Sequence, residues 1–542
     1  MNLAHFFEHW GIVENPFRGE EARHDGVFAR LGVVSTQERE RLARHGLVGG
    51  VSPRATHSDF EKILGSLTRP STSIVFGEKG SGKTAIRLQI EDSVRAHNGA
   101  TPEGKVFLVA YDDLNGVLDQ VHRRVAGGGG GDAGEAEIEK TFARIRLVDH
   151  MDAMLSAGVT SFVNGLIEGK GESAKEARRR LRSLSEPAGD DLLLLQSVYD
   201  AELSAPQRTR QLRRTLGRGL GGGAAVWTLL LFLGWVPAAG FVLLATLQFG
   251  LQGAWVFWVF AALLGIYSVV LAKVLLLDRW SLGGLGRRVA GEVVALPRVA
   301  RSYAESFGEL PAELRRSKGL PTSGSEETRY AMMDRFRRVL EPFGYTGMLV
   351  VIDRVDEPVL VNGDAERMRL IIWPLLNNKF LQKDGFGVKM LLPIELRHAL
   401  YKESARFFQE ARLDKQSLVD RLSWTGAALY DLAEARLRAC SDRGSGAAEN
   451  GSGNGPADGR DDGLSLLSLF AEDVSRQDVV DALDQMHQPR DAFKFLYQCL
   501  TEHCSNVTTG ERAYRVPKLV LESVRKQQSD RVQALYRGVT PA

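Results

Sequence analysis

The sequence predicts a three-layer α/β fold in which helices cover a central parallel sheet. Short apolar runs rich in β-branched residues end at Gly77 and at Asp353, as fully buried strands do. Segments with helical spacing alternate with these runs, which is typical of a parallel sheet. A third observation concerns the middle of the chain: the 54 residues between Arg218 and Lys273 contain no Asp, Glu, Lys or Arg.

The first predicted elements are a strand, a glycine-rich loop and a helix. Residues 73–76 form a short apolar run, and Ile86, Ile90 and Val94 then recur at helical spacing within 85–97. Residues 106–111 form a second buried-strand pattern. The order strand, loop, helix, strand is the start of a parallel α/β unit.

The second half of the sheet is predicted downstream of the uncharged segment. An amphipathic helix at 330–340 leads into a strand at 347–352, and further strands are expected at 387–392 and, more weakly, at 417–422. Five glycines at 127–131 predict a flexible break. The polar stretch 443–463 predicts a disordered linker.

These patterns divide the chain into eight segments. The lead-in is expected to pack on the sheet domain, and the last segment is expected to form a helical lid. The segments are 1–70 (lead-in), 71–125 (first half of the sheet domain), 126–223 (helical insert), 224–277 (apolar hairpin), 278–328 (helical return), 329–430 (second half), 431–463 (helix end and linker) and 464–542 (C-terminal helical segment).

The uncharged segment predicts a transmembrane helical hairpin. Two spans, 224–247 and 254–277, each reach roughly 36 Å at ~1.5 Å per residue, enough to cross a hydrocarbon core of about 30 Å. Arginines precede the first span and follow the second, so both ends are expected in the cytoplasm. Pro237 is expected to kink the first helix. The sequence thus predicts a multi-pass protein of the cytoplasmic membrane with the bilayer as partner through 224–277; the alternative is a buried helical hairpin.

Composition argues against several other classes of protein. A net charge of +2, from 69 basic and 67 acidic residues, gives no electrostatic reason to expect direct nucleic-acid binding. Cys440, Cys499 and Cys504 form no CxxC pair, so neither a disulfide framework nor a zinc site is indicated. Residues 1–17 lack the basic start and apolar core of a secretory signal.

The strongest motif is a phosphate-binding loop. Gly77 to Thr84 match G-x-x-x-x-G-K-[ST], and the flanking strand and helix are the context that this motif requires. Backbone N–H groups of such a loop and of the following helix N-terminus face phosphate oxygens, and Lys83 neutralises their charge. The residues expected to bind the nucleotide are Gly77, Glu78, Lys79, Gly80, Ser81, Gly82, Lys83, Thr84 and Ala85.

A magnesium ion is expected between this loop and the strand at 347–352. The Thr84 hydroxyl and the Asp353 carboxylate, which closes the strand, are the predicted protein groups at the metal. An Asp that ends a strand is common, so this assignment depends on the loop motif. The sequence therefore predicts Mg²⁺ and a nucleoside triphosphate together.

Hydrolysis would need a group that orients the attacking water. It would also need a cation that offsets the negative charge developing on the terminal phosphate. Asp356 and Glu357 are the candidates for the first role, although either can be a solvated loop charge. Arg490, which opens a helix in the C-terminal segment, is the favoured cation. Weaker candidates follow the later strands: Arg397, Arg412 and Arg421.

His57 and Asp59 precede the first strand. They either line the base side of the site or cap the helix that begins near Phe60, and the cap is favoured because Ser58 and Asp59 directly precede a helical pattern.

The combination resembles the KAP group of membrane-associated P-loop NTPases. The resemblance rests on the phosphate loop, the apolar hairpin inserted before the second half, and Ile352-Asp353-Arg354-Val355-Asp356, although the KAP motif has an acid where Arg354 stands. The chain is also similar to the wider STAND and ORC/AAA-like ATPases through Asn15-Pro16-Phe17 and Pro489-Arg490-Asp491. The resemblance implies a P-loop NTPase fold with a C-terminal helical lid, ATP as the nucleotide, and nucleotide-driven switching in signalling or defence.

Two function classes lead. The first is a membrane-anchored ATPase that switches a signalling or defence assembly, as a homo-oligomer or with a protein partner. The second is a non-hydrolysing nucleotide-binding membrane scaffold, because Arg354 leaves turnover open. Transport is disfavoured because the uncharged segment carries no ionisable residue before Lys273.

Overall fold

The protein is a mixed α/β structure built around a five-stranded parallel sheet. The computed structural model describes residues 1–18, 21–31, 56–125, 135–169, 172–218, 229–249, 254–273, 276, 278–316, 319–441, 464–508 and 513–536. It separates into two compact units: unit 1 comprises 1–108, 347–356 and 376–542, and unit 2 comprises 109–346 and 357–375. The predicted glycine break at 127–131 and linker at 443–463 lie outside the described residues.

The sheet has the strand order β2-β3-β4-β1-β5. Strand β1 pairs with β4 and β5, with Val75 opposite Leu391 and Val419, and β3 pairs with β4. Each strand predicted from the sequence is present. The strands are β1 (Ser73–Gly77), β2 (Lys105–Tyr111), β3 (Tyr345–Ile352), β4 (Phe386–Pro393) and β5 (Ser417–Val419).

Burial explains why the strands read as continuous apolar runs. All eight residues of β4 and all five of β1 are buried, which is expected for strands covered on both faces. Since neighbouring strands are parallel, their carboxyl ends meet at one edge of the sheet. The loop after β1 and the residues after β3 therefore lie at the same edge of the sheet.

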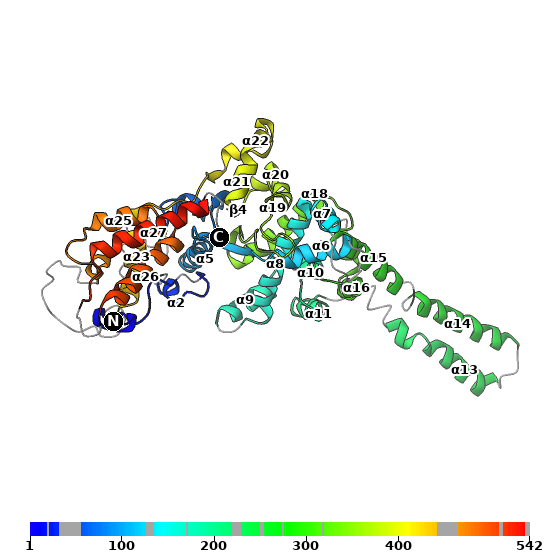
Figure 1. The fold of residues 1–542 in the computed structure, drawn as a ribbon. Helices are drawn as coiled ribbons and strands as arrows, with labels where there is room; N and C mark the ends of the chain where they lie inside the picture. Colours follow the sequence, from blue (N-terminus) through cyan, green and yellow to red (C-terminus); the bar gives the residue numbers. More distant parts are fainter. Residues whose placement is uncertain are drawn as a thin grey trace, which may run out of the picture. The chain divides into compact units, whose positions relative to one another are not determined.

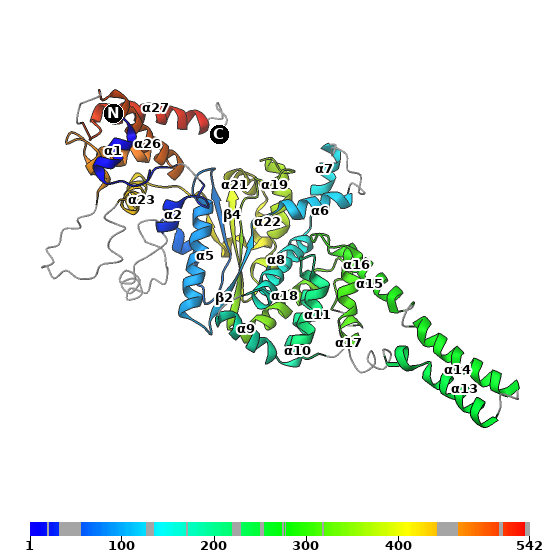
Figure 2. The same ribbon diagram turned by 90° about the horizontal axis from the view of Figure 1, so that it is seen from below.

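Two helices of unit 1 cover one face of the sheet. Helices α4 (Phe60–Leu64) and α5 (Lys83–Ala100) pack their apolar side chains on that face, and α5 runs along it in Figure 2. Ile86 and Ile90 of α5 share a buried cluster with Val75 and Leu391 of the strands. The remaining helices close to the sheet in sequence are short: α20 (Asn378–Leu381), α21 (Ile394–Tyr401) and α22 (Ala405–Ala411).

A second core of unit 1 is helical. It contains buried residues from both ends of the chain, for example Phe6, Leu429, Leu483 and Phe495. The N-terminal ammonium of Met1 donates to the carbonyls of Cys504 and Val507 at 3.1 and 2.7 Å. Its helices are α1 (Leu3–Trp10), α2 (Gly26–Leu31), α23 (Gly426–Ala439), α25 (Arg476–Asp484), α26 (Pro489–Asn506) and α27 (Lys518–Tyr536), with a 3₁₀ turn at Leu466–Leu469.

Unit 2 is largely helical, and its core contains a buried ion pair. Arg329 and Asp152 are fully buried and lie 3.0 Å apart, and the Tyr199 hydroxyl donates to the same carboxylate. Its helices are α6 (Asn115–Val125), α7 (Glu135–Phe142), α8 (Leu147–Ile167), α9 (Glu172–Arg182), α10 (Glu186–Tyr199), α11 (Ala205–Thr215), α13 (Val236–Phe249), α14 (Ala254–Ala272), α15 (Asp278–Glu292), α16 (Ala300–Gly308), α17 (Ala312–Arg316), α18 (Glu326–Leu340) and α19 (Ala365–Ile372).

The predicted first span, 224–247, is broken. Residues 229–233 are helical, 234–235 form a turn, and α13 begins at Val236, so that Pro237 is its second residue. Proline is tolerated at this position, whereas inside a continuous helix it removes a hydrogen bond and clashes with the preceding turn. The 14 residues of α13 reach only about 21 Å, short of a hydrocarbon core of about 30 Å. Residues 224–228 and 250–253 lie outside the described part.

Helices α13 and α14 lie side by side (Figure 1), and the Tyr267 hydroxyl donates to the Leu231 carbonyl at 3.0 Å. Across the residues that the structure describes, no helix combines the length and the apolarity needed to cross a membrane. The predictions of a transmembrane hairpin and of a multi-pass protein in the cytoplasmic membrane are therefore wrong. The predicted bilayer contact through 224–277 rested on those two spans.

Candidate functional site

The loop after β1 has the backbone shape of a phosphate cradle. Gly80 and Gly82 adopt φ values of 97° and 96°, in the left-handed region where residues with a Cβ are strained. The Ser81 N–H donates to the Glu78 carbonyl at 3.2 Å, which closes a tight turn. Helix α5 starts at Lys83, directly after this turn, so its N-terminal N–H groups face the loop.

Lys83 is held inside the loop. Its Nζ donates to the carbonyls of Gly77 and Glu78 at 2.7 and 3.0 Å. Burial lowers the pKa of the amine, and the nearby carboxylates of Asp356 and Asp353 oppose that effect. The ammonium is therefore fixed at the mouth of the loop, where a phosphate would need it.

Thr84 and Asp353 meet at the carboxyl edge of the sheet. The Thr84 hydroxyl donates to Asp353 Oδ2 at 3.3 Å, although the two residues are 269 positions apart. Asp353 is 1% exposed and directly follows β3. Burial raises the pKa of its carboxyl, while the Arg354 N–H, Lys83, Arg87 and the Thr84 hydroxyl act in the opposite direction. The predicted metal pair is thus brought together.

The two acidic candidates for water orientation differ in position. Asp356 is half-buried in unit 1, and among the nearby carboxylates it has the largest electrostatic effect on Lys83. Glu357 is exposed and belongs to unit 2. The geometry therefore favours Asp356 over Glu357 at this site.

Arg354, which directly follows Asp353, has an unusual backbone conformation. Its φ is 62°, which is uncommon for a residue with a long side chain. The guanidinium lies 3.2 Å from the Glu21 carboxylate, so this side chain is engaged in an ion pair with the N-terminal segment. Its backbone N–H donates to Asp353 Oδ1 at 2.9 Å and helps to orient that carboxylate.

The C-terminal helical segment touches the loop at Gly80. A Cβ placed on Gly80 would lie 3.0 Å from the Arg490 Cβ and 3.0 Å from Gln488 Oε1. Arg490 itself is exposed at the first turn of α26. Arg490, the predicted cation, therefore lies beside the loop at residues 77–84.

Glu78 joins the loop to two other segments. Its carboxylate lies 2.7 Å from the Arg421 guanidinium, beyond β5, and accepts a hydrogen bond from the Gln488 side-chain amide. Arg421 thus contacts the loop. Arg397 stacks over the Tyr401 ring, and Arg412 ends α22 in a left-handed conformation. Lys79 is exposed, and Ala85 lies half-buried in the first turn of α5.

His57 has a structural role. Its Nδ1 accepts the Asp59 backbone N–H at 3.0 Å, and its Nε2 lies 2.8 Å from the Ser423 carbonyl. The ring is buried and its pKa is lowered by burial. Asp59 is the N-cap residue of α4, but its side chain makes no capping hydrogen bond. Both ring nitrogens of His57 are thus already engaged.

Trp424 and Gln488 are residues of this site that sequence reasoning missed. The Trp424 indole N–H donates to the Ser81 carbonyl at 2.9 Å, and Gln488 contacts Glu78. The partners in these two contacts are 343 and 410 positions apart. Trp424 belongs to no recognisable spacing, and Gln488 directly precedes Pro489-Arg490-Asp491 but has no residue type that points to a contact with the loop.

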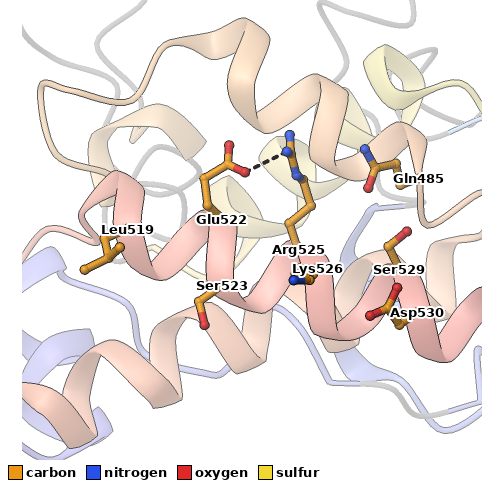
Figure 3. Close-up of a pocket in the computed structure, with 8 residues that line it drawn as sticks. All are labelled: Gln485, Leu519, Glu522, Ser523, Arg525, Lys526, Ser529 and Asp530. Carbon is orange, nitrogen blue, oxygen red and sulfur yellow. Dashed lines mark ion pairs between the residues drawn. The ribbon is translucent and has the colours of Figure 1, made fainter.

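A separate groove of about 480 Å³ runs along α27 (Figure 3). Its ion pair joins Glu522 and Arg525 at 2.6 Å. None of its lining residues belongs to the predicted nucleotide site. They are Gln485, Leu519, Glu522, Ser523, Arg525, Lys526, Ser529 and Asp530.

The comparisons with known proteins give no relative. No protein-family model matches the chain, and neither a curated protein nor a solved structure matches it. The resemblance to the KAP group is therefore without support beyond the motifs that carry it.

Proposed function

We propose that this chain is a P-loop protein that binds Mg-ATP at Gly77–Thr84 and acts as a nucleotide-dependent switch. The observation that carries the proposal is the contact between Thr84 Oγ1 and Asp353 Oδ2 at 3.3 Å. A hydroxyl and a strand-end carboxylate at the N-terminus of a glycine-loop helix are the groups that hold magnesium in P-loop proteins.

The residues present fit the expected ligands. Lys83 and the N–H groups at the start of α5 would hold the phosphates, and Thr84 and Asp353 would hold Mg²⁺. Magnesium, when bound, neutralises charge on the phosphates. Its protein ligands there are few, since phosphate and water oxygens complete the shell. ATP rather than GTP is taken from the resemblance, as is a role in signalling or defence within an assembly of copies or partners.

Hydrolysis is part of the proposal. Asp356 would accept a hydrogen bond from the attacking water, and Arg490 would offset charge developing on the terminal phosphate. Two observations support these roles. The Asp356 carboxylate lies close enough to Lys83 to raise the pKa of its amine, and Arg490 lies against Gly80. Glu357 is the weaker candidate because it is exposed and lies in the other unit.

The second candidate function is nucleotide binding without turnover. The observation that favours it is Arg354, which stands at the acidic position of the motif and pairs with Glu21. In that case ATP would hold the C-terminal helical segment against the loop. Nucleotide binding itself is common to both candidates.

Calorimetric titration of the full chain with Mg-ATP tests the binding step. Lys83→Ala should weaken binding at least tenfold, because charge-assisted hydrogen bonds contribute about 1.5–3 kcal/mol. Lys402→Ala removes an exposed lysine that ends α21 and serves as the matched control, with unchanged affinity. Equal affinity of wild type and Lys83→Ala would refute the proposed site.

A phosphate-release assay separates the two candidates. If the chain is an ATPase, Asp356→Asn should lower turnover at least a hundredfold while ATP still binds. If wild-type release equals that of Lys83→Ala although wild type binds ATP, the chain is a non-hydrolysing switch.

A further inference from the structure

Trp424 lies in the connection between β5 and α23, and its indole is buried against the phosphate loop. Its Nε1–H donates to the Ser81 carbonyl at 2.9 Å. The ring also lies 3.8 Å from the position that a Cβ on Gly82 would take. The indole therefore contacts two consecutive residues of the loop, immediately before Lys83.

The hydrogen bond fixes the orientation of one peptide group. In a planar trans peptide the carbonyl and the following N–H point in opposite directions. Because Trp424 holds the Ser81 carbonyl on its own side, the Gly82 N–H must point away from Trp424. Phosphate loops bind anions through backbone N–H groups directed in this way.

Trp424 itself is held by neighbours. The His57 ring meets the indole edge-on, with centroids 4.9 Å apart and an interplanar angle of 86°. His57 is in turn anchored to the Ser423 carbonyl at 2.8 Å. The position of the indole is thus supported by a buried ring that is itself hydrogen-bonded, in addition to its own bond to Ser81.

Trp424 also touches the turn between α25 and α26. Its backbone N–H donates to the His487 carbonyl at 3.4 Å, and His487 has a φ of 59°, an uncommon conformation outside glycine. The next residue, Gln488, is bound to Glu78 at the other end of the loop. His487 is therefore connected to Ser81 through Trp424, and Gln488 is connected directly to Glu78.

We propose that Trp424 is a positioning residue: it orients the Ser81–Gly82 peptide for phosphate and links that orientation to the α25–α26 turn. The proposal rests on the function proposed above and deepens it. Occupation of the loop by a phosphate that binds the Gly82 N–H would then stabilise the turn at His487 through the indole and its backbone N–H.

The test is Trp424→Phe, which keeps an aromatic ring against His57 but removes the N–H donor. Loss of one buried hydrogen bond predicts about tenfold weaker Mg-ATP binding with little change in the melting temperature without nucleotide. Trp10→Phe is the matched control, since the Trp10 indole donates to the Tyr514 carbonyl at 2.8 Å within the helical core. That variant should bind ATP as the wild type does.

Hydrogen exchange supplies a readout that a packing role would not change. Adding Mg-ATP should slow exchange at the first turn of α26 equally in wild type and in Trp10→Phe, and clearly less in Trp424→Phe, where the contacts of Gln488 and Arg490 with the loop remain but the indole link is lost. Wild-type affinity in Trp424→Phe, or equal losses in both variants, would overturn this inference alone. Absence of ATP binding in the wild type would instead overturn the proposed function, and this inference with it.

Discussion

Lys389 provides the sharpest prediction about stability. It is fully buried in the central strand β4, and its Nζ has no hydrogen-bond partner among the described residues. Burial lowers the pKa of this amine from 10.5 to about 7. An unpaired ammonium in such a place is strongly unfavourable, so replacing it with a side chain of similar shape should stabilise the protein.

The magnitude follows from the pKa. At about 1.4 kcal/mol for each pH unit, a fall from 10.5 to about 7 destabilises the folded state by about 4–5 kcal/mol at pH 7. Relaxation around the amine reduces this figure, so Lys389→Met should gain about 2–4 kcal/mol. For a chain of 542 residues, whose unfolding entropy is about 1.1 kcal/mol/K, that corresponds to a melting temperature higher by roughly 2–4 °C.

The stability gain from Lys389→Met should decrease as the pH rises. Because the folded pKa is lower than the unfolded pKa, the unfolded chain binds more protons between pH 7 and pH 10.5. Wild-type stability relative to Lys389→Met therefore increases as the pH rises through this window. The advantage of the variant should be full below pH 7 and should disappear near pH 10.5.

Thermal unfolding of both proteins at pH 7 and at pH 9.5 is the assay. Lys402→Met, which changes an exposed lysine, is the control and should leave the melting temperature unchanged. A Lys389→Met protein that melts at or below the wild-type temperature at pH 7 would refute the reasoning. So would a gain of equal size at both pH values.

Two further predictions concern stability. Arg329→Met should destabilise the protein by about 3–5 kcal/mol in denaturant unfolding, because it leaves the buried Asp152 carboxylate without its cation. Arg301→Met, which breaks an exposed ion pair, is the control and should destabilise the protein by less than about 1 kcal/mol. Equal losses of stability in the two variants would contradict the burial argument. Gly82→Ala should lower stability by about 1–2 kcal/mol, since its φ of 96° is unfavourable for alanine, and an unchanged unfolding midpoint would show that the loop does not hold this conformation.

Much of the fold could be predicted because buried positions produce recognisable apolar patterns over short stretches of sequence. Strands buried on both faces appear as continuous apolar runs, so the β1 and β4 positions were recognisable. The coarse prediction of an α/β fold with a parallel sheet is confirmed. The helix after the loop was equally visible, because Ile86 and Ile90 recur at helical spacing and both are buried.

The hairpin prediction failed for a local reason. Hydropathy averages over a window and does not register where a helix stops, whereas Pro237 makes α13 begin at Val236. A proline near the start of an apolar run was read as a kink within one long helix. The structure shows that it marks a helix start.

Long-range contacts of the site lay beyond sequence reasoning. The motif named Lys83, Thr84 and Asp353, since spacing and strand ends identify them. The contacts of Trp424 with Ser81 and of Gln488 with Glu78 depend on how distant segments pack, and no periodicity encodes them. The ion pair of Arg354 with the N-terminal segment is of the same kind.

The most direct measurement of the central claim is the effect of Mg²⁺ on ATP affinity in wild type and in Asp353→Asn. Titration of ATP with and without Mg²⁺ should show an affinity at least tenfold higher with the metal in wild type. Asp353→Asn should bind metal-free ATP comparably and lose most of that gain, because one carboxylate ligand is replaced by a neutral amide. An equal Mg²⁺ effect in both proteins, or no ATP binding by the wild type, would contradict the account.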